Sequence, residues 1–178
     1  MLDNIEFIEM DKKYFDLFFD IMKNSFPKNE MRDYVSQKKL LYNKYYKPLV
    51  LKVEDKVLAI MATWEFEDFV FIEHLAIHSK LRGQGIGTKL IKNYLSKTKK
   101  EIFLEVEPPT CEISKKRILF YEKLGFCLND FYYLQQPLNP NDSSFELKIM
   151  SYSKNISEKK FEKYKKVIYK EVYKVILT

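Results

Sequence analysis

The feature that most constrains the fold of this chain is a glycine-rich stretch, Leu81-Arg82-Gly83-Gln84-Gly85-Ile86-Gly87-Thr88. It lies between an apolar run at residues 70–77 and a helical pattern at residues 86–95. The protein has four glycines in 178 residues, and three of them are in this stretch. Glycine is needed where the backbone adopts positive φ or where another group approaches the main chain closely. The stretch therefore predicts a strand-to-helix turn at which a ligand contacts main-chain atoms.

Composition indicates a domain that folds on its own. Hydrophobic residues make up 46% of the 178 residues, which is enough for a packed core. No apolar run approaches the roughly 18 residues that a membrane helix needs, so neither membrane insertion nor secretion is expected. Cys111 and Cys127 lack a paired spacing, and His74 and His78 are the only histidines. We therefore expect a cytoplasmic protein with free thiols and no metal site.

The net charge of +6 has two functional interpretations. A basic surface suits nucleic acid, but here the lysines are spread over several helical patterns, and no helix concentrates basic and base-reading residues on one face. A basic balance also suits a small polyanionic ligand, because a cleft lined by one sign of charge concentrates its counter-ion. We do not expect a nucleic-acid partner.

The order of hydrophobic patterns predicts an α/β fold with a mixed, mostly antiparallel sheet flanked by helices. The polar break at residues 54–56 favours a hairpin, and the next strand extends it to an antiparallel meander. The helix between residues 69–77 and 102–106 predicts that these two strands are parallel neighbours. Strands are expected at residues 5–8, 49–53, 57–66, 69–77, 102–106, 126–134 and 145–150. Helices are expected at residues 11–26, 29–38, 86–95, 114–124 and 157–177. Asp11 is expected to cap the first helix and Pro27 to end it, and Gly125 is expected to close the helix at residues 114–124.

The glycine stretch does not match the two commonest nucleotide-binding loops. For the fingerprint G-x-G-x-x-G, a start at Gly83 places Thr88 in the last position, and a start at Gly85 places Leu90 there. The phosphate-binding loop G-x-x-x-x-G-K-S/T fails as well, because Thr88 follows five residues after Gly83. A glycine turn at a helix N-terminus still predicts a phosphate site, because it exposes main-chain N–H groups at the positive end of the helix.

What fits is Arg82-x-x-Gly85-x-Gly87, which closely resembles the acyl-coenzyme A binding signature of the GNAT superfamily of N-acetyltransferases. The resemblance extends to Ile72-Glu73-His74-Leu75-Ala76-Ile77 before the loop and to Phe120-Tyr121-Glu122-Lys123-Leu124-Gly125-Phe126 after it. It runs from about residue 57 to residue 126. The resemblance implies a single GNAT-like acetyltransferase domain at residues 1–152. Residues 153–178 would then form an amphipathic C-terminal helix that packs on the domain or, alternatively, on a partner in a homodimer.

The resemblance implies acetyl-coenzyme A as cosubstrate, with no metal, and it assigns residues to each part of the cofactor. The pantetheine arm would contact the main chain of Leu75, Ala76 and Ile77. The pyrophosphate would be held by Arg82, Gly83, Gln84, Gly85, Ile86, Gly87 and Thr88. The far end of coenzyme A would contact the segment that contains Ser114, Lys115, Lys116 and Arg117.

Acetyl transfer needs a neutral amine and an acid for the leaving thiolate. The resemblance implies that Tyr121 is the acid. Glu73 is our candidate base, directly or through water, and an acid buried on that strand face with Phe71 and Leu75 is expected to titrate near neutrality. Two alternatives remain open: a base on the neighbouring strand, at Glu105 or Glu107, or no dedicated base. His74 is expected on the opposite face as a structural residue.

These residues predict an N-acetyltransferase that transfers the acetyl group of acetyl-coenzyme A to a primary amine of a small molecule or peptide. The alternative from another class is a non-catalytic module that binds and senses acyl-coenzyme A. Nucleic-acid binding ranks third.

Overall fold

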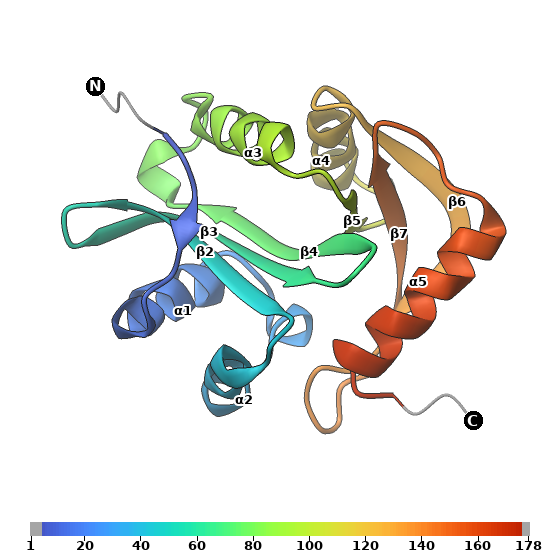
Figure 1. Ribbon diagram of the computed structural model, residues 1–178, viewed down its shortest axis with the longest axis horizontal. Helices are drawn as coiled ribbons and strands as arrows, with labels where there is room; N and C mark the ends of the chain where they lie inside the picture. Colours follow the sequence, from blue (N-terminus) through green and yellow to red (C-terminus); the bar gives the residue numbers. More distant parts are fainter. Residues whose placement is uncertain (1–4, 176–178) are drawn as a thin grey trace. The chain divides into compact units, whose positions relative to one another are not determined.

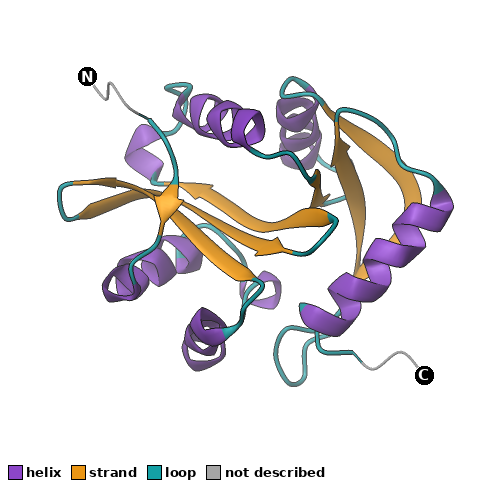
Figure 2. Cartoon of the chain, in the orientation of Figure 1, coloured by secondary structure: helices purple, strands orange, loops and turns teal. Residues whose placement is uncertain are grey.

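The computed structural model describes residues 5–175 of the chain. Inter-residue contacts divide it into two compact units, Met1–Lys100 and Glu101–Thr178, and each is described by itself. The expected fold class is confirmed: the described residues form an α/β protein whose seven strands make a mixed, mostly antiparallel sheet flanked by helices (Figure 2). Within residues 5–175, no helix is both long and apolar enough to cross a bilayer.

The first unit begins with a short strand and two helical segments (Figure 1). Strand β1 is Ile8–Glu9, and Asp11 then caps the 3-10 turn η1 (Lys12–Tyr14) by accepting the N–H of Lys13. Helix α1 continues as Phe15–Lys23, so the predicted cap is confirmed, although the helix ends before Pro27.

The second predicted helix, residues 29–38, is split into two segments. A 3-10 turn, η2, covers Lys28–Glu30, and helix α2 covers Tyr34–Lys39. The reason is Asp33, whose carboxylate accepts the N–H of Ser36 and so sets a new helix N-terminus in the middle of the predicted element. The 3-10 turn η3 (Leu40–Tyr42) then leads into the sheet.

The predicted meander is confirmed as β2 (Tyr46–Val53), β3 (Lys56–Glu65) and β4 (Phe69–Ile77), paired antiparallel in this order. One register shift interrupts the pairing of β3 with β4. Ala62 lies opposite His74 while Thr63 lies opposite Ile72, so Glu73 is an extra residue without a partner across the ladder. Such a β-bulge bends its strand locally and changes the direction of nearby side chains.

A 3-10 turn, η4 (Ser79–Leu81), follows β4, and helix α3 (Ile86–Lys97) follows the glycine loop. Within this unit, α1 and α2 lie on one side of the strands and α3 lies on the other (Figure 1). Helix α3 packs its buried Ile86 and Leu90 against Leu51 and Ala59 of the sheet. This packing fixes the start of α3, and with it the position of the glycine loop.

The second unit contains β5 (Glu101–Val106), α4 (Glu112–Glu122), β6 (Phe126–Gln135), β7 (Phe145–Tyr152) and α5 (Glu158–Glu171). Strand β7 lies between β5 and β6 and pairs antiparallel with both. After α4, Gly125 adopts φ +95°, which agrees with the glycine predicted to close this helix.

Helix α5 packs against strands of its own unit. Its Phe161 ring stacks on Phe131 at 4.3 Å between ring centroids, and the Tyr164 hydroxyl donates to Glu101 Oε2 at 2.8 Å. The helix ends at Glu171, six residues before the predicted end at Leu177, which lies outside the described residues. Helix α5, which follows the predicted domain boundary at residue 152, therefore contacts strands that precede this boundary. A homodimer stays a prediction.

Candidate functional site

The glycine loop between β4 and α3 contains two residues in the left-handed region. Gly83 has φ +77° and Gly85 has φ +73°. A Cβ atom built on either residue would meet no other atom within 4 Å. Glycine is therefore required here by backbone conformation and not by internal crowding, and the space beside the loop is open to a ligand.

The N-terminus of α3 leaves main-chain donors unused by the helix. The N–H of Lys89 donates to Gly85 O at 3.1 Å, and helix geometry gives the amides of Ile86, Gly87 and Thr88 no partner within the helix. Gly85 occupies the N-cap position and has no side chain to accept from them. Three N–H groups that the helix itself does not use, at its positive end, form a site that suits an anion such as a phosphate.

The polar side chains of the loop bond to the protein itself. Arg82 donates from Nε to Ile77 O at 3.0 Å and from Nη2 to Ser25 Oγ at 3.3 Å. Gln84 donates from Nε2 to Lys80 O at 2.9 Å. These contacts hold the loop against the end of β4, so its main chain is the part best placed to meet a ligand.

The predicted pantetheine-binding residues lie at the end of β4. Leu75, Ala76 and Ile77 are paired with Met61, Ile60 and Ala59 of β3. Together with the loop and Glu73, they belong to the first unit, whereas Ser114, Arg117 and Tyr121 belong to the second. The contact of Leu75, Ala76 and Ile77 with pantetheine stays a prediction.

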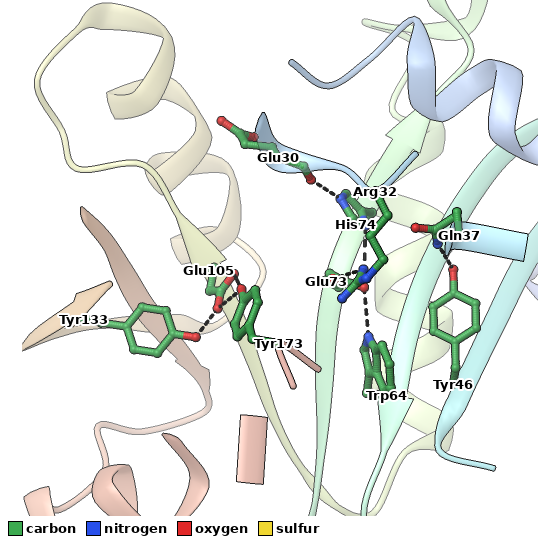
Figure 3. Close-up of polar contacts among 10 residues, drawn as sticks. All are labelled: Glu30, Arg32, Gln37, Tyr46, Trp64, Glu73, His74, Glu105, Tyr133 and Tyr173. Atoms are coloured by element: carbon green, nitrogen blue, oxygen red, sulfur yellow. Dashed lines mark hydrogen bonds and ion pairs between the residues drawn. The ribbon is translucent and has the colours of Figure 1, made fainter. Parts of the chain in front are cut away.

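Glu73, the bulge residue of β4, has a buried side chain, and each of its carboxylate oxygens accepts a hydrogen bond (Figure 3). Its side chain is only 4% exposed. Arg32 donates from Nη1 to Oε1 at 2.7 Å, and Trp64 donates from Nε1 to Oε2 at 2.8 Å. Burial acts to raise the pKa of this carboxyl, but the Arg32 charge, His74 and the two hydrogen bonds outweigh it and lower the pKa. The expectation that Glu73 titrates near neutrality was wrong, because nothing in the sequence indicated that Arg32 would pair with this carboxylate.

His74 lies on the same side as Glu73, so the expectation that it faces the opposite side was also wrong. Its Nδ1 is 3.8 Å from Glu73 Oε2, and the bulge explains why two successive residues share a side. His74 Nε2 is 2.7 Å from Glu30 O, which requires an N–H there, and its ring packs against Phe26. Burial lowers the pKa of the imidazole, so it is neutral at physiological pH. The predicted structural role of His74 agrees with these contacts.

Tyr121 lies on α4 and is 9% exposed. Its ring packs edge-on against Phe120 and Phe126. Burial raises the pKa of the hydroxyl to about 12, against the opposing effect of Arg117. The hydroxyl is therefore protonated at neutral pH and is available as a donor, since no hydrogen bond from it to another residue in the range 5–175 is formed.

The other predicted residues of α4 are engaged at its N-terminus. Ser114 is 1% exposed; its hydroxyl accepts the Cys111 N–H at 3.2 Å, and its own N–H donates to Cys111 Sγ at 3.5 Å, which together form a capping box. Arg117 forms an ion pair with Glu107. Ser114 thus serves the helix, while Arg117 is exposed, and contact of either residue with coenzyme A stays a prediction.

Glu105, one of the two alternative bases, also has partners. The Tyr173 hydroxyl lies 2.8 Å from Oε2 and 2.9 Å from Oε1, and the Tyr133 hydroxyl donates to Oε1 (Figure 3). Within residues 5–175, no three His, Cys, Asp or Glu side chains lie together as metal ligands would.

Comparison with known proteins identifies the family. The model described as "Acetyltransferase (GNAT) family" matches residues 12–126, which is more than half of the chain. The chain therefore belongs to the GNAT acetyltransferase family. Over 111 residues it is 34% identical to a protein of Bacillus subtilis (strain 168) named "Putative acetyltransferase YjbC". That similarity covers 61% of this chain and 56% of the relative, so the chain spans just over half of the relative's length.

Solved structures agree with this assignment. A GNAT-family protein from Bacteroides thetaiotaomicron superposes with a TM-score of 0.89 at 25% identity, over 96% of this chain and 99% of that one. An aminoglycoside 6'-N-acetyltransferase complexed with coenzyme A superposes with a TM-score of 0.58 at 15% identity, over 85% of this chain and 99% of that one. The second likeness shows a shared fold only.

Proposed function

We propose that this protein transfers the acetyl group of acetyl-coenzyme A to a primary amine. The observation that carries the proposal is the uncapped N-terminus of α3, which follows two left-handed glycines in a member of the GNAT family. Its amides and helix charge suit the pyrophosphate of coenzyme A. The coenzyme A complex of a similar fold supports this choice of donor.

The reaction forms one N–C bond, breaks one C–S bond, removes a proton from the amine nitrogen and delivers a proton to sulfur. Acetyl-coenzyme A supplies the activated acyl group. Tyr121, whose hydroxyl stays protonated, donates a hydrogen bond to the sulfur as negative charge develops there. Glu73, which is ionised at neutral pH, takes the amine proton directly or through water. Its lowered pKa makes it a weak base, which suffices once N–C bond formation has made the nitrogen acidic.

The acceptor is a small-molecule amine or a peptide amine, and the residues named above favour neither. We place the reaction in the cytoplasm, supported by the two unpaired thiols of Cys111 and Cys127. No nucleic-acid partner is proposed.

A second candidate function is the binding of acyl-coenzyme A without turnover. It is favoured by one observation: each of the three candidate bases, Glu73, Glu105 and Glu107, already accepts hydrogen bonds from neighbouring side chains. A site that only binds coenzyme A needs the glycine loop and no base.

Measuring thiol release and binding on the same sample separates the two functions. The purified chain is incubated with acetyl-coenzyme A and, in turn, a polyamine, an aminosugar and a peptide with a free N-terminus. Calorimetry measures acetyl-coenzyme A binding in parallel. Acetyl transfer predicts thiol release that exceeds the amine-free background with at least one acceptor class. Binding without release for every amine would leave the sensing function, and absence of binding would remove both.

A further inference from the structure

The ion pair between Arg32 and Glu73 joins two distant parts of the first unit. Arg32 lies just before α2, 41 residues from Glu73, and its side chain is 7% exposed. Trp64 on β3 is fully buried and reaches the same carboxylate. Each carboxylate oxygen thus accepts from a different element (Figure 3).

This arrangement is costly to build for stability alone. Taking two charges out of water carries a desolvation penalty that their attraction often fails to exceed, so apolar replacements of buried pairs are frequently neutral or stabilising. The pair also lies at the β-bulge of β4, a feature found near functional sites because it redirects a side chain. Both points favour a role for the pair in orienting Glu73.

We propose that Arg32 and Trp64 are positioning residues that hold Glu73 as an oriented anion at the bulge of β4, ready to receive the proton of the acceptor amine. The inference rests on the acetyl transfer proposed above. One donor to each oxygen fixes the plane of the carboxylate and leaves each oxygen a further lone pair for a water or an amine.

Among the residues that the structure describes, three titratable groups interact with this carboxylate. Arg32 approaches from the segment before α2, His74 lies beside it on β4, and Tyr46 of β2 is close enough for the Glu73 charge to raise its pKa. Tyr46 and His74 are neutral at physiological pH because burial disfavours their charged forms. Arg32 is therefore the one cation among these three, and removing its charge lets burial dominate, so that Glu73 takes up a proton.

The single tryptophan of the chain provides a direct probe of Glu73. Because Trp64 Nε1 donates to Glu73 Oε2, protonation of that carboxylate changes the indole environment. Fluorescence is recorded from neutrality down to pH 4.5, the ordinary pKa of the group. Wild type is expected to show no Glu73 transition in this range. Arg32→Met is expected to show one, and the double variant Arg32→Met/Glu73→Gln, which keeps His74, is expected to lose it.

Control variants test whether the fluorescence transition arises from the loss of any cation rather than from the loss of Arg32. Lys97→Met removes the cation of an exposed ion pair with Glu6 in the same unit and is expected to behave as wild type. Arg32→Lys retains a cation and is expected to suppress the transition again. Circular dichroism at each pH shows that the fold is retained. If Arg32→Met has the same fluorescence profile as its double variant, Arg32 does not hold Glu73 ionised and the inference fails.

Kinetics tests the positioning role itself. With an accepted amine, the acid limb of kcat/KM is expected at higher pH in Arg32→Met than in wild type, with kcat lowered and Arg32→Lys partly restoring both. An unchanged acid limb alongside a shifted fluorescence transition would overturn the positioning role. Absence of turnover by wild type would instead overturn the proposed function, and the fluorescence result is independent of it.

Discussion

Replacing Gly85 with alanine tests the loop with a change whose cost can be worked out from the backbone. Gly85 has φ +73°, and an added Cβ atom meets nothing within 4 Å, so the substitution introduces conformational strain and no collision. A non-glycine residue in the left-handed region costs about 1–2 kcal/mol. The loop relieves the strain by moving Gly85 out of this region, which turns the amides of Ile86 and Gly87 away from an anion.

Binding of acetyl-coenzyme A must then restore the strained geometry, so the dissociation constant is expected to rise by about 5- to 30-fold, the factor equivalent to that free energy. Calorimetry measures it, and thermal unfolding measures stability. Gly125→Ala is the control, because Gly125 has φ +95° in the second unit and its added Cβ meets the Tyr152 ring at 3.3 Å. Gly125→Ala is expected to lose stability without a change in the dissociation constant, whereas Gly85→Ala is expected to lose less stability because its loop relaxes. If Gly85→Ala binds acetyl-coenzyme A as wild type does, the loop does not hold the cofactor.

Three further changes separate catalysis, helix docking and charge. Tyr121→Phe is expected to lower kcat about a hundredfold with little change in cofactor affinity, and thiol-release kinetics with calorimetry checks both. Tyr173→Phe removes the hydroxyl that contacts Glu105 and is expected to lower the urea-unfolding free energy by about 1–3 kcal/mol. Glu73 has a lowered folded-state pKa, so its charge stabilises the fold above its ordinary pKa of 4.5, and this contribution is lost as pH falls through the lower folded value. The stability difference between wild type and Glu73→Gln, measured in urea, should therefore shrink from neutral pH to below pH 4.5.

The parts of this fold that could be predicted from the sequence depend on residues that are close together along the chain. Strand β4 has the predicted bounds, Asp11 caps the first helical turn, and Gly125 follows α4 with positive φ. Each depends on residues within a few positions along the chain: an apolar run, a carboxylate two residues before the N–H that it accepts, and a glycine after a helix. The glycine loop is also governed by local sequence, because the spacing of its glycines alone excluded the two commonest nucleotide-binding loops.

The β-bulge at Glu73 and the pairing of its carboxylate with Arg32 could not be predicted from the sequence. In a regular strand, side chains alternate between faces, which placed His74 opposite Glu73. One extra residue relative to β3 breaks that alternation, and nothing in Ile72-Glu73-His74-Leu75 marks it. Arg32 lies in a polar segment whose sequence is typical of an exposed helix N-terminus. Its contact with Glu73 exists only because the chain returns to β4 after 41 residues.

The segment between α1 and α2 is held to the β4 side of the first unit at three points. Ser25 accepts from Arg82 of the glycine loop, Glu30 O accepts from His74, and Arg32 donates to Glu73. The first contact reaches the proposed phosphate loop, and the other two reach the bulge that carries the proposed base. A polar segment with little regular structure gains a fixed position in this way, because the three tethers join it to β4 and to the loop that follows β4. The same segment therefore supports both halves of the proposed chemistry in this unit, and substitutions within residues 25–32 are expected to change cofactor binding and the Glu73 environment together.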